Sequence, residues 1–200
     1  MADFNASSKM FDWVKGFTMD FDSKTGMSSM METSKRYLSA MKGMFADDQA
    51  YEEKLKQGDE LVYEFHEIGA PEVPGDLAFG CSITYPGKVG NEYFMTKGHF
   101  HTILETAEVY YCFSGHGYML LENPEGEWSA LELTPGKAVY VPRRCAHRSI
   151  NVDPTEKLVT FYVFPADAGH DYGSIETKGY RKLLVEQDGQ PQIIDNPKWK

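Results

Sequence analysis

The 200-residue sequence predicts an all-β fold, a small antiparallel β-barrel or sandwich, with a short helical N-terminal extension. Short runs of apolar, β-branched and aromatic residues recur from residue 60 onward, and turns that contain Gly or Pro separate them. The chain has no alternation of strands and helices and no GxGxxG motif, which argues against a nucleotide-binding α/β fold. A hydrophobic content of 42% is enough for a sizeable core.

The chain is predicted to have two parts. Residues 1–57 are expected to form a helical extension that packs on the barrel or on a partner, and residues 58–200 are expected to form the barrel domain. Within the extension, apolar residues recur every three or four positions over 28–44, which predicts a helix. Residues 47–56 predict a second short helix, because Asp47 and Asp48 suit a helix N-terminus.

The barrel domain contains several runs with strand-forming composition, at 61–66, 78–85, 108–113, 117–122, 128–133, 138–141 and 158–164. The third and fourth of these runs are predicted to pair as a hairpin around residues 114–117. A last hairpin is predicted over 181–195, with Asp188 and Gly189 as its turn.

Charge and cysteine content limit the classes of function. The net charge of −10 gives no support to a nucleic-acid or anionic-membrane partner. No apolar run approaches the roughly 20 residues that cross a bilayer, and the first residues lack the apolar core of a secretion signal. Cys81, Cys112 and Cys145 show no CxxC spacing, so we expect free thiols in a reducing cytoplasm.

Four residues have the composition of a metal site. His99 and His101 are two positions apart, so on a strand they point the same way. Glu108 is expected on the return strand of the same hairpin, and His147 on another strand that a closed barrel brings close. Three imidazoles and a carboxylate form a first shell for one divalent metal per subunit, with Fe²⁺ as the first expectation and Mn²⁺, Zn²⁺, Co²⁺ or Ni²⁺ as alternatives.

Other candidates near these ligands are expected to have different roles. His66 and His116 belong to no comparable group of candidate ligands and are predicted not to bind metal. Arg143 and Arg144 are predicted to be solvated surface residues. Residues 96–98 lead directly into the metal strand and offer a hydroxyl group and backbone N–H groups, which a phosphorylated ligand would need in so acidic a protein.

The same residues resemble the two motifs of the cupin superfamily. In the second motif Gly136, Pro142, His147 and Asn151 match at every spacing, but Arg144 stands where Gly is usual. In the first motif the two His, the Glu and Gly115 match. Six residues separate His101 from Glu108 instead of three or four, and Tyr93 occupies the position of the leading Gly.

The segments TKGHFH, PGKAVYVPRRCAHRSIN and above all FPADAGHDYGSIETKGY resemble the cupin-type phosphoglucose isomerases of archaea and some bacteria. The resemblance covers roughly residues 58–200. It implies a jelly-roll-like cupin barrel, a homodimer, and interconversion of glucose 6-phosphate and fructose 6-phosphate in glycolysis and gluconeogenesis. It places Ser82, Thr96, Gly98 and Tyr110 at the phosphate, with Lys97 between them, and Tyr63, His170 and Tyr172 at the sugar. Phe164 stands where some relatives carry Tyr.

This expected activity implies specific roles for the predicted metal, Glu108 and His170. A divalent metal that chelates O1 and O2 of the sugar would polarise the carbonyl group. Glu108 is the predicted base for the C2 proton in a cis-enediol mechanism, and His170 is predicted to assist ring opening or proton movement. A direct hydride shift, which needs no base, is the alternative mechanism.

The sequence leaves two other functions open and does not decide on mannose 6-phosphate as a second substrate. An iron-dependent cupin dioxygenase would use the same three His and one Glu. A non-catalytic sugar-binding cupin would keep the barrel but has less reason to keep a complete ligand set.

Overall fold

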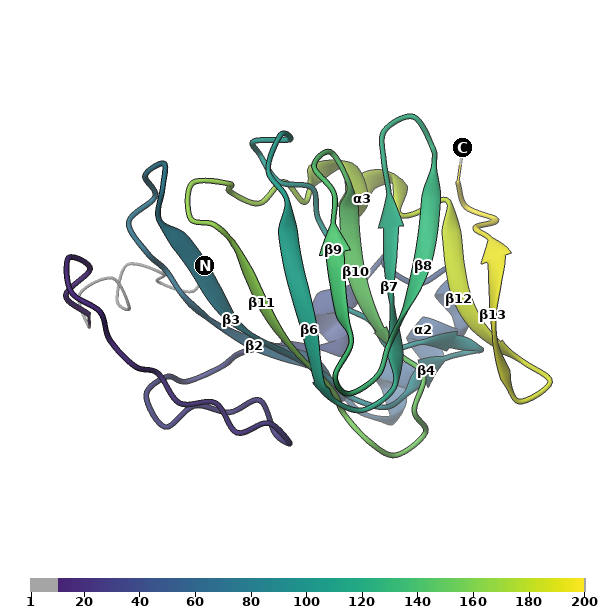
Figure 1. The fold of residues 1–200 in the computed structure, drawn as a ribbon. Coiled ribbons are helices and arrows are strands. Elements are labelled where there is room, and N and C mark those ends of the chain that lie inside the picture. Colours follow the sequence, from purple (N-terminus) through teal and green to yellow (C-terminus); the bar gives the residue numbers. More distant parts are fainter. Residues whose placement is uncertain (1–10, 200) are drawn as a thin grey trace.

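The computed structural model describes residues 11–199 (Figure 1). Its strands are β1 Ser34–Tyr37, β2 Leu61–Ile68, β3 Leu77–Thr84, β4 Lys88–Val89, β5 Glu92–Tyr93, β6 Glu108–Ser114, β7 Gly117–Glu122, β8 Trp128–Leu133, β9 Ala138–Val141, β10 Ala146–Asn151, β11 Leu158–Pro165, β12 Lys182–Gln187 and β13 Gln190–Asp195. Its helices are the 3₁₀ turn η1 Leu38–Met41, α2 Asp48–Gln57 and α3 Gly173–Lys178.

The strands form three antiparallel sheets, which confirms the predicted all-β class. The largest has the order β1-β2-β3-β11-β6-β9, the second β10-β7-β8, and the third β13-β12-β5-β4. The side chains of Tyr63 on β2, Tyr110 on β6 and Phe164 on β11 are buried. Tyr63 belongs to one apolar cluster, and Tyr110 and Phe164 to another, so the interior has two apolar regions that both reach the largest sheet. No helix among residues 11–199 is long and apolar enough to cross a membrane.

The predicted helix over 28–44 is wrong. Residues 34–37 form β1, an edge strand paired with β2, and only the short turn η1 follows. The apolar spacing that suggested a helix is satisfied by this turn, which buries Leu38 and Met41. The second predicted helix is confirmed as α2, where the Asp47 side chain accepts a hydrogen bond from the Ala50 N–H. The division of the chain at residue 57 stays a prediction.

The predicted hairpin of 108–113 with 117–122 is also wrong. β6 pairs with β11 and β9, whereas β7 pairs with β10 and β8 in another sheet. Residues 114–117 therefore carry the chain from one sheet to the other. Gly115 has a φ of 86°, and a Cβ there would collide with the carbonyl oxygen of Lys157.

The C-terminal hairpin is confirmed as β12 and β13. Its turn residues Asp188 and Gly189 have φ values of 52° and 73°. Positive φ at both central positions is typical of the type I′ turns that match the twist of a β-hairpin.

Glu92 on β5 attaches the N-terminal segment to the barrel. Its Oε2 accepts a hydrogen bond of 2.8 Å from the backbone N–H of Ala46. The side chain is buried, and its Oε1 has no hydrogen-bond partner in the described structure. Burial raises the pKa of this carboxyl to about 7.

The raised pKa predicts how stability depends on pH. Because the folded pKa exceeds the ordinary value, Glu92 stabilises the fold at low pH, and this contribution is lost as the pH rises towards 7. Glu92→Gln keeps the hydrogen-bond acceptor but does not titrate. When the pH is raised from 4.5 to 8, the free energy of unfolding of the wild type should fall relative to that of the variant. The difference between the two proteins should change by up to about 3 kcal/mol in favour of the variant.

Urea denaturation of both proteins at the two pH values, in the presence of a chelator, measures this difference. Equal pH dependence of the two proteins would contradict the assignment to Glu92.

Candidate metal centre and substrate cavity

A two-residue backbone bridge brings the two predicted metal motifs together. The N–H of His147 donates to the carbonyl oxygen of His99 at 3.1 Å, and the N–H of His99 donates to the carbonyl oxygen of His147 at 3.4 Å. His147 lies on β10, which confirms that it comes from another strand. His99 lies in no extended strand, because only isolated bridges hold the segment 99–101.

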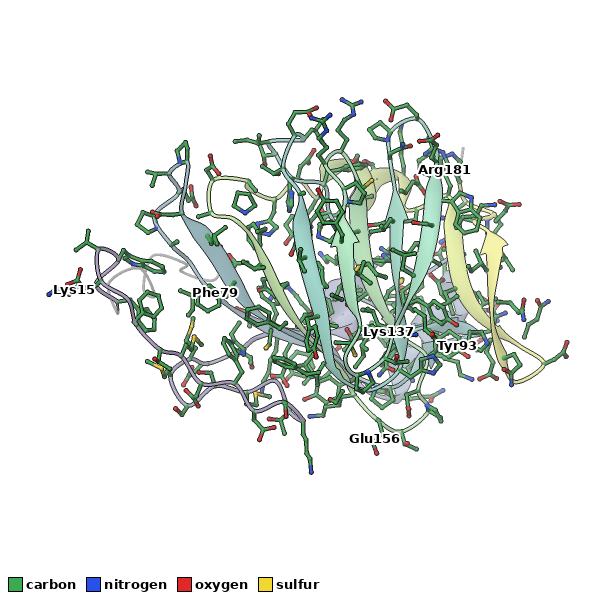
Figure 2. The ribbon with its side chains drawn as sticks, in the orientation of Figure 1. Lys15, Phe79, Tyr93, Lys137, Glu156 and Arg181 are labelled. Carbon is green, nitrogen blue, oxygen red and sulfur yellow. The ribbon has the colours of Figure 1, made fainter. Side chains whose placement is uncertain are left out.

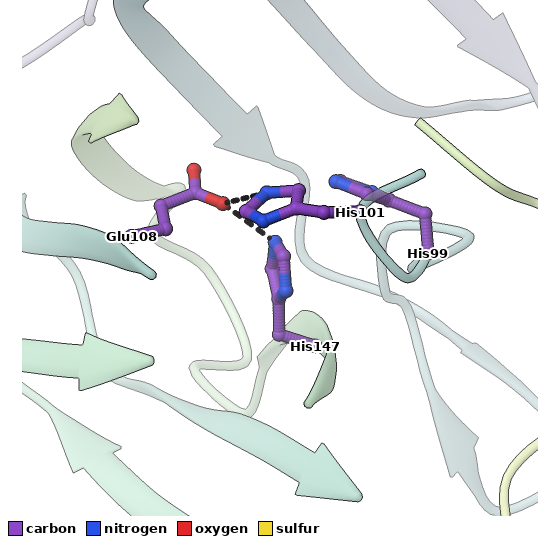
Figure 3. A group of neighbouring side chains, drawn as sticks. All are labelled: His99, His101, Glu108 and His147. Carbon is purple, nitrogen blue, oxygen red and sulfur yellow. Dashed lines mark hydrogen bonds and ion pairs between the residues drawn. The ribbon is translucent and has the colours of Figure 1, made fainter. Parts of the chain in front are cut away.

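Glu108 completes the group, but not from the place that the sequence predicts. It is the first residue of β6 and pairs with Val141 of β9, so the expectation of a return strand next to His99 is wrong. Its Oε2 lies 3.2 Å from Nε2 of His101 and 2.8 Å from Nε2 of His147, as Figure 3 shows. One potential ligand atom from each of the four residues lies within 4.8 Å of the others.

The hydrogen bonding of the cluster fits a divalent metal. The Nε2 atoms of His99 and His147 are buried and make no hydrogen bond, although the latter is close to the Glu108 carboxylate. Leaving such groups unpaired costs about 1–3 kcal/mol each. A cation bound by both atoms would satisfy them. The set of three nitrogens and one carboxylate suits Fe²⁺, Mn²⁺, Zn²⁺, Co²⁺ or Ni²⁺.

Neighbouring groups hold the cluster in the protonation states that a metal needs. The Thr106 hydroxyl lies 2.8 Å from Nδ1 of His101, which leaves Nε2 of that ring facing Glu108. Burial, followed by the neighbouring imidazoles, lowers the pKa of His99 well below its ordinary value, so the ring is neutral. Burial alone would raise the pKa of Glu108, but His147 and His101 outweigh it and hold this pKa at about 2.

A cavity of about 320 Å³ opens beside the cluster. It contains the predicted metal ligands His99, Glu108 and His147 in its wall. All the residues predicted to bind substrate also line it, namely Tyr63, Ser82, Thr96, Lys97, Gly98, Tyr110, His170 and Tyr172. Their contacts with a substrate stay a prediction.

The loop over residues 96–98, which is predicted to bind phosphate and is here called the phosphate loop, is tightly constrained. Gly98 has a φ of 75°, and a Cβ there would collide with the Tyr180 hydroxyl, so glycine is required. The N–H of Ser149 donates to the Thr96 hydroxyl at 3.1 Å. Lys97 extends its ammonium group to Glu176 on α3, at 2.9 Å. This ion pair leaves mainly the backbone of Lys97 facing the cavity.

A buried guanidinium group lies behind this loop. Arg148, next to the metal ligand His147, is 2% exposed. Its Nη2 donates to the carbonyl oxygen of Lys97 at 2.5 Å, and its guanidinium stacks on the Tyr180 ring at 4.3 Å. A fixed positive charge therefore lies beside the phosphate loop despite the acidic composition of the chain.

His170 lies against the metal cluster without being part of it. Its ring centroid is 4.4 Å from that of His99, and its ring stacks on Tyr172 at 6.0 Å. Burial lowers the pKa of His170 to about 4, so the imidazole is neutral at pH 7 and can accept a proton.

The remaining candidates lie away from the cluster. His66 lies 2.7 Å from the carbonyl oxygen of Gly26, and His116 pairs with Glu132, which agrees with their predicted exclusion from the metal site. Arg143 and Arg144 are exposed, as expected. Arg144 has a φ of 67°, the left-handed conformation for which Gly is the usual residue.

The sequence reasoning missed six residues of the cavity wall, which are Phe65, Glu67, Glu72, Ser149, Tyr162 and Gly169. Alternation along β2 contains the signal for two of them, because Tyr63, Phe65 and Glu67 share one face of a strand. Likewise, Tyr162 shares its face of β11 with Phe164. Burial and the nearby charge of Glu108 raise the pKa of Glu67 to about 8.

Some solved structures align with part of the fold. An oxalate oxidase in complex with the substrate analogue glycolate aligns with a TM-score of 0.41 and 14% identity, over 50% of this chain and 47% of the other. An oxalate decarboxylase from Bacillus subtilis aligns with a TM-score of 0.39 and 26% identity, over 47% of this chain and 22% of the other. These partial alignments carry no conclusion about function.

Comparison of the sequence with known proteins establishes the family of the chain. A family model described as glucose-6-phosphate isomerase matches residues 35–200. A glucose-6-phosphate isomerase of Thermococcus litoralis is 47% identical over 92% of this chain and 96% of its own length. One from Pyrococcus furiosus is 44% identical over 92% of this chain and 97% of its own length. The chain belongs to the glucose-6-phosphate isomerase family, which confirms the resemblance of its motifs.

Proposed function

We propose that this protein is a metal-dependent glucose-6-phosphate isomerase that interconverts glucose 6-phosphate and fructose 6-phosphate. The observation that carries the proposal is the meeting of the four-residue cluster and the phosphate loop in one cavity of a chain from this family. A sugar phosphate needs hydrogen-bond donors for the phosphate group at one end, and a metal site for the sugar oxygens at the other end.

His99, His101, Glu108 and His147 would hold the metal. When bound, a divalent ion polarises a carbonyl group and stabilises negative charge on the sugar oxygens. The phosphate loop and the Ser82 hydroxyl would bind the phosphate, and the guanidinium of Arg148 would favour its negative charge from behind the loop. Tyr63, Tyr110 and Tyr172 would form the walls around the sugar.

Two residues are proposed to handle protons. Glu108 is the proposed base for the C2 proton, although its low pKa makes it a weak one. His170, which is neutral at pH 7, would assist ring opening. Turnover in deuterated water distinguishes the two mechanisms, because a freely exchanging enediol incorporates solvent deuterium at early turnover and a direct hydride shift does not.

Several finer properties belong to the same proposal. We expect Fe²⁺ to be the native metal, a homodimeric assembly, and a cytoplasmic role in glycolysis and gluconeogenesis. Activity after reconstitution with each of the five candidate metals, and sedimentation of the metal-loaded protein, test the first two. The dioxygenase and non-catalytic alternatives are not favoured, because the family assignment provides no support for either.

The central prediction concerns metal dependence. Purified protein should isomerise fructose 6-phosphate without oxygen, lose this activity with a chelator, and regain it when a divalent metal is added. His147→Gln should reduce kcat/KM by at least about 100-fold, because it removes a ligand. His116→Gln, which changes a partly exposed histidine in the connection between β6 and β7, is the matched control and should keep full activity.

A coupled assay for glucose 6-phosphate measures these rates. Folded, metal-loaded wild-type protein without turnover would refute the proposed function.

A second prediction concerns Ser82. Its side chain is buried in the cavity wall and has no hydrogen-bond partner among the described residues, so its hydroxyl is available to a ligand. Ser82→Ala should raise KM for fructose 6-phosphate about tenfold, the cost of one hydrogen bond to a charged group, with little change in kcat. Ser129→Ala, on β8, is the control. An unchanged KM would remove Ser82 from the phosphate site.

A further inference from the structure

Glu67 is a carboxyl group in the cavity wall that makes no ion pair with any residue of 11–199. It lies on β2, half-buried, and both charges that act on it most strongly are negative, those of Glu108 and Glu72. Its Oε2 receives one long hydrogen bond of 3.4 Å from the Tyr162 hydroxyl. Within the described residues, no hydrogen bond to Oε1 is present, and Glu67 lines the cavity.

The register of the largest sheet explains this geometry. Glu67 pairs with Gly80 of β3, and Gly80 pairs with Tyr162 of β11. Residues directly opposite each other share a face of the sheet. Since Gly80 has no side chain, the Tyr162 hydroxyl reaches across β3 to the carbonyl oxygen of His66, at 3.1 Å, and to Glu67.

The position of Glu67 along β2 separates it from the phosphate loop. Tyr63 lies at the loop end of the cavity, where burial raises the pKa of its hydroxyl and the nearby backbone of Lys97 offsets part of this rise. Glu67 is four residues further along the same face, about 13 Å away at the usual rise of a strand. A carboxyl group near the phosphate would repel it, whereas at this distance it faces the polyhydroxylated part of a sugar phosphate.

A second cavity, of about 500 Å³, adjoins the first at this end. Glu67, Phe164 and His170 line both cavities, so they stand where the two meet. Keeping an unpaired carboxyl at such a place costs stability. Its raised pKa, caused by burial and then by Glu108, increases the protonated fraction that can donate as well as accept hydrogen bonds.

We propose that Glu67 determines specificity in this cavity, by hydrogen-bonding a hydroxyl group of the sugar at the end remote from the phosphate. Tyr162 is the positioning residue, because its hydroxyl holds one oxygen of Glu67 and leaves the other for the ligand. The inference rests on the proposed function, since it assumes a sugar phosphate as ligand.

The experiment compares two unreactive probes, glucitol 6-phosphate and inorganic phosphate, by calorimetric titration of metal-loaded protein. Glu67→Met keeps the length of the side chain but forms no hydrogen bond, and should weaken glucitol 6-phosphate binding about tenfold. Its affinity for inorganic phosphate should change less than twofold. Glu67→Gln should restore most of the lost affinity, and Tyr162→Phe should give an intermediate loss.

Glu156→Gln is the control, because Glu156 lies on the exposed loop before β11 at the lower edge of Figure 2. Thermal unfolding of Glu67→Met should occur at or above the wild-type temperature, since the variant removes an unpaired buried carboxyl. Unchanged affinity for glucitol 6-phosphate, or an equal loss for both probes, would overturn the proposal. Turnover by the wild type is measured separately, so a failure of the isomerase assignment is distinguishable from a failure of this contact.

Discussion

A short antiparallel ribbon positions both halves of the candidate site. Residues 94–99 run against residues 147–151, and backbone hydrogen bonds join His99 to His147, Thr96 to Ser149, and Phe94 to Asn151. One end of this ribbon carries two of the predicted metal ligands, and the middle carries the loop proposed to bind phosphate. Because backbone hydrogen bonds hold both, the distance between the two proposed sites is set by backbone geometry and not by flexible side chains.

The electrostatics of the cavity are local and differ from those of the whole chain. The protein carries a net charge of −10, yet Arg148 is buried behind the phosphate loop. Burying a guanidinium group is costly unless its charge is compensated. Here Tyr180, the Lys97 carbonyl oxygen and the charges of Glu92 and Glu122 compensate it. A net negative charge and a buried positive charge therefore coexist in one small domain.

Local patterns predicted the parts of this structure that depend on local geometry. The turn at Asp188–Gly189 follows from φ preferences, and this prediction is confirmed. His99 and His101 lie in one cluster as predicted, although isolated bridges and not an extended strand hold their segment. The partner of β6 did not follow, because residues 114–117 change sheets and only long-range packing decides this. Alternation along β2 places Glu67 on the same face as Tyr63, but its environment depends on Gly80 and Tyr162 of other strands, which no local pattern predicts.

Two of the three departures from the general cupin pattern, Arg144 and the lengthened segment after His101, are in contact. Its backbone N–H donates to the carbonyl oxygen of Leu104 at 2.6 Å, in the lengthened segment between His101 and Glu108. Its side chain pairs with Glu125 at 2.7 Å and approaches Glu105 at 3.8 Å. A left-handed arginine costs about 1–2 kcal/mol more than a glycine, but glycine has no side chain to hold the longer segment. The Arg144 side chain thus links the lengthened segment before Glu108 to the loop between β7 and β8, two parts of the chain that a glycine at this position would leave without a side-chain contact.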